Sequence, residues 1–202
     1  MKVLRPRAAN RCQGFGATGA LESWAAGHGR LRVGVPVHHG VTTADIIIPG
    51  EVLATALGAR VQFVGRDLGQ VVGVEPSRPV MISDRYEDAA HPDVVLIPGG
   101  LGWRGQADDD RVTSWLRIAC GFAAGVLCVS TGSLVLAAAG LLTDQDVAGH
   151  WLGEDHMAEL GAHPVSDRVH ISADGRVVTA SGALAAASAA PMLAARVLNR
   201  RR

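Results

Sequence analysis

The stretch VLCVSTGSLVLAAAGLL, Val126–Leu142, decides the fold of this chain. It begins as a continuous apolar run, which is typical of a buried strand, and continues as an alanine- and leucine-rich segment, which is typical of a helix. The helix is expected to begin at about Thr131-Gly132, so the chain bends at Ser130. A tight turn from strand to helix often presents a nucleophile above the sheet, where the helix N-terminus adds positive potential.

Two residues of this stretch are candidate nucleophiles, Cys128 and Ser130. In a strand–turn–helix unit the nucleophile stands at the bend, and the amide that follows it faces a developing oxyanion. Ser130 occupies the bend. Cys128 lies inside the strand, where a cysteine usually packs as a small hydrophobic residue. We therefore assign the functional position to Ser130 and a structural position to Cys128.

Strand-like and helix-like segments alternate on both sides of this unit. The expected strands are 31–37, 60–65, 93–100 and 126–130, with a short hairpin or edge excursion over 71–82 and a second hairpin over 168–181. The expected helices are 47–59, 108–125, 131–140, 153–161 and 183–199. This alternation predicts an α/β fold, a mostly parallel sheet with helices on both faces, in which ligands bind outside the carboxyl ends of the strands.

Three local signals refine this pattern. Pro49 is tolerated in the first turn of a helix, so the helix over 47–59 is expected to begin just before it. Asp174-Gly175 favours a type I′ turn for the hairpin over 168–181. Pro191 predicts a kink in the last helix.

The chain divides into an extension over residues 1–30 and one domain over residues 31–202. The extension is rich in Arg, Ala and Gly and has no clear periodicity, whereas 202 residues suffice for one sizeable core. The segment GFGATG, Gly14–Gly19, matches the dinucleotide fingerprint, but no strand precedes it, as that motif requires. A glycine-rich loop is therefore the favoured interpretation.

Composition excludes several classes of partner and site. The formal net charge is zero, so no nucleic-acid partner is expected. No apolar run approaches the roughly 20 residues of a membrane span, and the start lacks the apolar segment of a secretory signal. The cysteines, Cys12, Cys120 and Cys128, show no paired spacing. We expect a cytoplasmic protein with no membrane partner, no metal and no cofactor.

Five segments from Val33 onward resemble the ThiJ/PfpI superfamily: VGVPVHHGVTTADIIIPGEVL, PDVVLIPGG, STGSLVLAAAGLL, GHW and DGRVVTASG. The resemblance implies a flavodoxin-like sandwich of the class I glutamine amidotransferase type. It is strongest to the isonitrile hydratases and to the ligand-binding domains of AraC-type regulators. Members commonly form homodimers with the active crevice near the interface, so the resemblance also implies a homodimer.

The resemblance implies a pair of catalytic residues. Members carry a reactive cysteine immediately before Thr-Gly, which is the position of Ser130, and an acidic residue after the first strand, which Asp45 matches. In isonitrile hydratases this carboxylate is expected to donate and accept protons. An N-cap is the alternative for Asp45, but its apolar neighbours would leave a carboxylate poorly solvated, which suits proton transfer.

The resemblance also implies an oxyanion pocket. The backbone of Gly99-Gly100 matches the glycine turn that helps to form it, and Thr131 supplies the amide that follows the nucleophile. His150, in the segment GHW, matches a histidine that lies near the nucleophile in several members.

The chain departs from the family at the nucleophile, since Ser130 stands where a cysteine is usual. A thiol is partly ionised at neutral pH, whereas a hydroxyl needs a base within hydrogen-bond reach. His38 and His39, at the exit of the first strand, face the same crevice, and one of them or His150 is a candidate base. The alternatives are that His38 and His39 are a solvent-exposed pair and that His150 makes a structural hydrogen bond.

The sequence therefore supports two functions for a small-molecule binder. The first is a lyase of the isonitrile hydratase type, which adds water to an electrophilic carbon with Ser130 and Asp45. The second is a catalytically silent ligand-binding or stress-response member, and whether the protein is an enzyme stays open. Three explanations for Ser130 stay open. It is the natural nucleophile of a serine enzyme, the natural residue of a member that binds a ligand without turning it over, or an engineered replacement of a cysteine.

Overall fold

The computed structural model describes residues 30–74 and 79–200, so the expected extension and its GFGATG segment lie outside the described residues. A seven-stranded sheet in the order β10-β11-β7-β6-β1-β2-β5 forms the centre. Its strands in chain order are β1 (Arg32–Pro36), β2 (Arg60–Gly65), β5 (Asp84–Arg85), β6 (Val94–Ile97), β7 (Gly125–Val129), β10 (Val169–Ile171) and β11 (Val177–Ala180). Only β10 runs antiparallel to its neighbour, which confirms the mostly parallel sheet.

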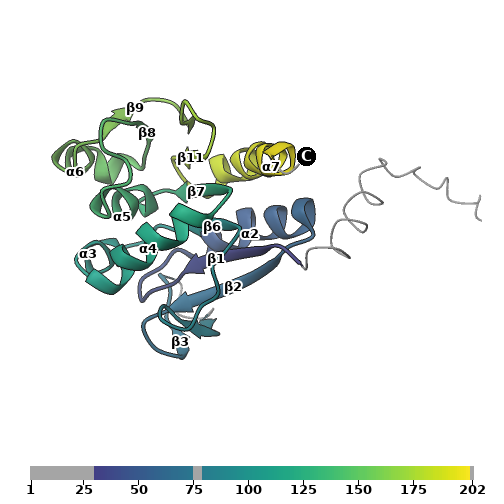
Figure 1. The fold of residues 1–202 in the computed structure, drawn as a ribbon. Helices are drawn as coiled ribbons and strands as arrows, with labels where there is room; N and C mark the ends of the chain where they lie inside the picture. Colours follow the sequence, from purple (N-terminus) through teal and green to yellow (C-terminus); the bar gives the residue numbers. More distant parts are fainter. Residues whose placement is uncertain (1–29, 75–78, 201–202) are drawn as a thin grey trace, which may run out of the picture.

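Helices cover both faces of this sheet, as predicted (Figure 1). The helices are α2 (Thr43–Leu57), α3 (Trp103–Ala107), α4 (Asp110–Phe122), α5 (Gly132–Ala138), the 3-10 helix η1 (Trp151–Gly153), α6 (Glu154–Glu159) and α7 (Ala183–Arg200). α2 and α7 lie together on one face, and α3, α4 and α5 lie on the other (Figure 1).

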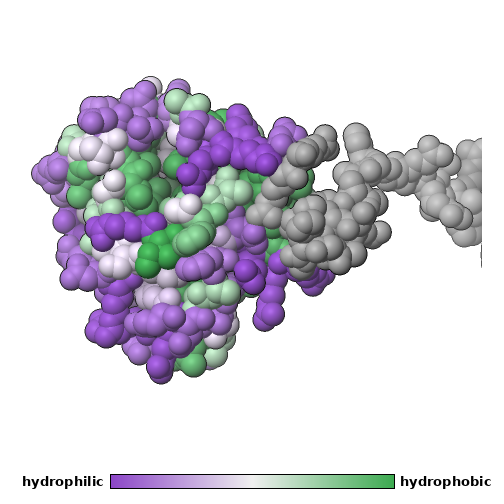
Figure 2. Space-filling view, in the orientation of Figure 1, coloured by the Kyte–Doolittle hydropathy of each residue, from purple (hydrophilic) through white to green (hydrophobic). Residues whose placement is uncertain are grey.

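The central strands are buried on both faces, which explains their continuous apolar sequences. In β7, Leu127 and Val129 pack into the core under α2 and α7, whereas Val126 and Cys128 pack into the core under α4 and α5. Successive side chains of a strand point to opposite faces, so each face requires its own apolar set. The surface shows hydrophobic patches within a largely hydrophilic face (Figure 2).

Two small strand pairs lie outside the central sheet. β3 (Gly69–Val71) pairs antiparallel with β4 (Val80–Ile82), which is the excursion expected between the second and third central strands. β8 (Asp146–Ala148) pairs in parallel with β9 (His163–Val165) and was not predicted. α3 was also not predicted, because a five-residue helix has too few residues for a clear period.

The prediction for the start of α2 was wrong. The helix begins at Thr43, so Pro49 lies in its interior rather than in its first turn. Because proline is tolerated best in the first turn of a helix, Pro49 indicated a start several residues too close to the C-terminus. The actual N-cap is Thr42, and Asp45 stands in the first helical turn instead of capping it.

The prediction of a type I′ turn at Asp174-Gly175 was also wrong. Gly175 has a φ of 69°, but Asp174 does not, since Ser130 and Asp144 are the non-glycine residues with positive φ in the described ranges. The Asp174 carboxylate instead accepts hydrogen bonds from the Ser172 hydroxyl and the Arg176 amide. An aspartate that bonds to its own loop stabilises a wider turn than the two-residue type.

The start of α5 lies directly against the end of β6. A Cβ on Gly132 would overlap the carbonyl oxygen of Ile97 and would lie 2.9 Å from that of Pro98. Only glycine allows this approach, which brings the first turn of α5 to the carboxyl edge of the sheet.

We predict that Gly132→Ala lowers the free energy of unfolding by about 1–3 kcal/mol, because the added methyl group meets backbone oxygens that cannot move independently. Gly121→Ala in α4 is the matched control, since a Cβ there meets nothing within 4 Å. Urea denaturation of both variants measures the difference. Equal stability of the two variants would contradict this close approach.

Candidate active site

Ser130 forms a strained turn between β7 and α5. Its φ is 56°, a left-handed conformation that costs a non-glycine residue roughly 1–3 kcal/mol. The amide of Ser130 donates to the Ala180 carbonyl at 2.8 Å, and the Ser133 hydroxyl donates to the Ser130 carbonyl at 3.0 Å. The bend therefore lies where the sequence predicts it, and neighbouring strand and helix residues hold it in place.

Cys128 packs inside β7, as predicted. Its side chain is fully buried, and burial raises the pKa of its thiol well above the usual range. Burial likewise raises the pKa of Cys120 to about 12. A thiol of that kind stays protonated at neutral pH and is a poor nucleophile.

The Gly99-Gly100 turn, which follows β6, packs directly on the Ser130 turn. A Cβ on Gly99 would lie 2.8 Å from the Cβ of Ser130 and 2.7 Å from the Thr131 amide nitrogen. The Thr131 hydroxyl accepts a hydrogen bond from the Gly100 amide at 2.9 Å and donates one to the Gly100 carbonyl at 3.1 Å. One side chain thus fixes both polar groups of Gly100.

Asp45, in the first turn of α2, contacts the same glycine turn. The residue is 2% exposed, and its Oδ2 accepts a hydrogen bond from the Gly99 amide at 3.2 Å. The Thr42 amide donates to the Gly99 carbonyl at 3.0 Å. Asp45 and Ser130 therefore both contact Gly99, so the structure brings the two predicted catalytic residues to one turn.

This turn lies at the switch point of the sheet. The chain passes from β1 to β2 on one side and later returns to place β6 on the other side of β1. Ligands of open α/β sheets bind in the crevice that such a reversal leaves at the carboxyl ends of the strands. The amides of Gly99 and Gly100 already donate to side chains of the protein, so their role toward an oxyanion stays a prediction.

The hydrogen bonds of two histidines define which of their nitrogens carries the proton. The Nδ1 atom of His150 accepts from the Leu152 amide at 3.2 Å, and the Nδ1 atom of His39 accepts from the Val72 amide at 3.2 Å. In each neutral ring the proton is therefore on Nε2, which donates. In these tautomers neither ring accepts a proton from Ser130 through its free nitrogen.

His38 lies in a different part of the crevice. It lines a cavity over the ends of β1 and β2, together with residues that follow β2 and residues of α3. Burial lowers the pKa of its imidazole, although the hydrogen bond to the His39 carbonyl opposes this effect. Within residues 30–74 and 79–200, the Ser130 hydroxyl makes no hydrogen bond to a histidine.

Two kinds of feature are absent from the described part of the chain. It contains no group of three or more His, Cys, Asp and Glu side chains that would suit a metal ion. Among the helices of the described ranges, none combines the length and the apolar character that a membrane crossing needs.

The sequence did not predict two residues of this site, Thr42 and Gly132, because both act through backbone contacts.

Comparison with known proteins agrees with this architecture. Residues 31–195 match the model of the DJ-1/PfpI family. The chain belongs to the DJ-1/PfpI family. This confirms the resemblance found in the sequence.

Relatives in this family include an enzyme of known activity. The chain is 35% identical over 154 residues to the isonitrile hydratase of Pseudomonas putida, across 75% of this chain and 65% of that protein. The match thus spans less than two thirds of the relative's length.

Solved structures confirm the flavodoxin-like fold of the family. A THiJ/PfpI family protein from Pseudomonas syringae has a TM-score of 0.73 at 25% identity, over 85% of this chain and 69% of that one. A ThiJ/PfpI domain protein from Brachyspira murdochii has a TM-score of 0.75 at 20% identity, over 85% of this chain and 99% of that one. The second likeness shows the fold alone.

We predict that Ser130→Gly is more stable than Ser130→Ala by about 1 kcal/mol. Both changes remove the hydroxyl, but only glycine also removes the Cβ that disfavours a φ of 56°. The free energies of unfolding of the two variants, measured in urea, test this. A more stable alanine variant would show that Ser130 is not strained.

We also predict that Thr131→Val destabilises the protein by roughly 2 kcal/mol, because the buried amide of Gly100 loses its partner, whereas the Gly100 carbonyl keeps the Trp103 amide. Thr131→Ser keeps the hydroxyl and serves as the matched control, with a loss of about 1 kcal/mol from the missing methyl group. Thermal or urea denaturation compares them, and equal losses would rule out this double hydrogen bond.

Proposed function

We propose that this protein is a lyase of the isonitrile hydratase type, which adds water to the terminal carbon of an isonitrile and yields an N-substituted formamide. The observation that carries the proposal is the convergence of Ser130 and Asp45 on Gly99. The 35% identity to an isonitrile hydratase supports the choice of substrate class.

The proposed reaction has two stages, and Asp45 moves the protons. In the first, the Ser130 oxygen bonds to the isonitrile carbon, and that carbon gains a proton, which gives a formimidate ester. In the second, water adds to the same carbon and its two protons pass to the nitrogen and to the serine oxygen, while the carbon–oxygen bond to Ser130 breaks. The product has one N–H and one formyl group, so the sum is isonitrile plus water. The amide of Thr131, at the start of α5, is the donor proposed for developing negative charge.

Asp45 is the proposed base because the histidines do not serve that role in this structure. Its carboxylate is buried beside the Ser130 turn, whereas the accepting nitrogens of His39 and His150 are already bonded to backbone amides. Asp45 is proposed to activate either Ser130 or the attacking water.

A second candidate function is a catalytically silent ligand-binding member. The observation in its favour is that a serine hydroxyl, which ionises far less readily than a thiol, occupies the family's cysteine position. We further propose that the protein is a cytoplasmic homodimer without nucleic-acid or membrane partners; its membership of the family supports the homodimer.

Turnover of cyclohexyl isonitrile, followed as formamide production, tests the proposal. We expect activity in the parent protein, and a loss of about 10²-fold or more in Ser130→Ala and in Asp45→Asn. Ser130→Cys is expected to gain rate, because the thiol supplies more of the ionised nucleophile. Ser188→Ala is the control, since Ser188 lies exposed on α7 and bonds only within its helix.

The variants separate the candidate functions. Activity in Ser130→Cys with none in the parent would support the silent member. Full activity in Ser130→Ala would assign the chemistry to Asp45 and water alone. No formamide from any of these proteins would refute the hydratase.

A further inference from the structure

A cavity of about 330 Å³ lies over the carboxyl ends of β1 and β2. Its wall comes from five segments: the residues that follow β1, the β2–β3 connection with β3, the end of β4, α3 with the residue before it, and the cap of α4. The apolar part of the wall consists of Val37, Leu68, Val71 and Ile82. A small, partly apolar space with a few polar groups is typical of a ligand site.

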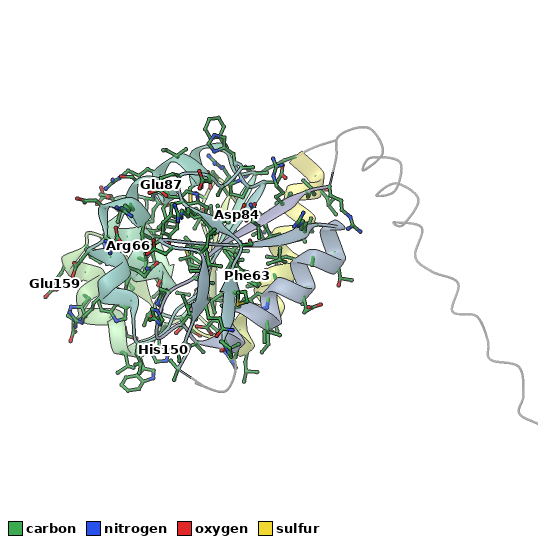
Figure 3. The ribbon with its side chains drawn as sticks, turned by 90° about the horizontal axis from the view of Figure 1, so that it is seen from below. Phe63, Arg66, Asp84, Glu87, His150 and Glu159 are labelled. Carbon is green, nitrogen blue, oxygen red and sulfur yellow. The ribbon has the colours of Figure 1, made fainter. Side chains whose placement is uncertain are left out.

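This cavity is separate from the Ser130 site. Ser130 follows β7, and β6 lies between β7 and β1, the nearer of the two strands below the cavity. Neither Ser130 nor Asp45 belongs to the wall of the cavity. Arg66, which follows β2 and belongs to the wall, is labelled in Figure 3.

His38 contributes a buried hydrogen-bond acceptor without a partner. The residue is 7% exposed, and its Nδ1 lies 2.9 Å from the His39 carbonyl oxygen. A carbonyl oxygen only accepts, so Nδ1 carries the proton and Nε2 of the neutral ring is an acceptor. Within the described ranges, Nε2 has no hydrogen-bond partner. A buried polar atom in this state destabilises the fold until a donor reaches it.

The charged residues of the wall favour a cation. Asp67 and Asp109 supply two carboxylates, and Arg66 supplies one guanidinium group, 3.9 Å from Asp109 Oδ2. Asp109 Oδ1 accepts the Arg111 amide and caps α4, and Oδ2 faces the Arg66 guanidinium group. Gln70 and Gln106 add amide groups, which both donate and accept. The carboxylates of the wall therefore outnumber its guanidinium group by one.

We propose that this cavity is a second binding site, which takes a small primary alkylammonium ion. One N–H of the ammonium group donates to His38 Nε2, Asp109 balances its charge, and the alkyl chain contacts Val71 and Ile82. Because Nε2 is shielded from bulk water, the ligand displaces a side chain of the wall, and Leu68 and Gln70 are exposed enough to move. The proposal does not depend on the hydratase reaction.

Titration of the full chain with n-propylammonium chloride, followed by ¹⁵N NMR of the imidazole nitrogens, tests it. We expect saturable binding with a shift of His38 Nε2, and weaker or no binding of propionate and 1-propanol. His38→Phe should weaken binding roughly ten-fold or more, since it removes the acceptor but keeps a ring. Asp109→Asn should weaken it about three-fold or more, because asparagine keeps the helix cap but removes the charge.

Two controls make the test specific. Asp110→Asn changes the adjacent carboxylate, which is not part of the wall, and Ser130→Ala changes the other site. Both should bind n-propylammonium as the parent does. The proposal is overturned if the parent shows no saturable shift, if His38→Phe and Asp109→Asn both bind as tightly as the parent, or if Ser130→Ala abolishes binding.

Discussion

The candidate active site depends on the contact between the Gly99-Gly100 turn and the strained turn at Ser130. Gly99 has no room for a side chain because the Cβ of Ser130 and the amide of Thr131 occupy that space. Asp45 bonds to the amide of Gly99, and Thr131 bonds to both polar groups of Gly100. Segments from α2, β6 and the start of α5 are thereby fixed at one point, which offsets the cost of a left-handed serine.

This arrangement has a consequence for the chemistry. The glycine amides act inside the protein, where they orient Asp45 and Thr131, so the site is organised before any ligand arrives. The histidines contribute less than their number suggests. His39 and His150 accept backbone amides, and His38 lies over β1 and β2 rather than beside Ser130. The carboxylate of Asp45, which bonds to the glycine that packs on Ser130, is therefore the base that we propose.

Much of this could be predicted from the sequence, because β6 and β7 are continuous apolar strands and the helix after Ser130 is rich in alanine and leucine. The bend at Ser130 follows from where that helix must begin. The rest depends on contacts that no local pattern records. Pro49 suggested a later start for α2, and the side chain of Asp174 widened a turn that its sequence alone would close tightly. The cavity that His38 lines, to which Ser130 does not belong, is built from segments far apart in the sequence, which periodicity does not reveal.

A double-mutant cycle between Asp45→Ala and Thr131→Val tests the central claim most directly. The two side chains bond to adjacent residues of one turn, so each change loosens the segment that the other side chain holds. Urea denaturation of the parent, both single variants and the double variant yields their coupling energy. If the turn joins the two sides, the coupling is about 0.5–3 kcal/mol. Losses that add to within about 0.3 kcal/mol would show that Asp45 and Thr131 act independently and would contradict the account.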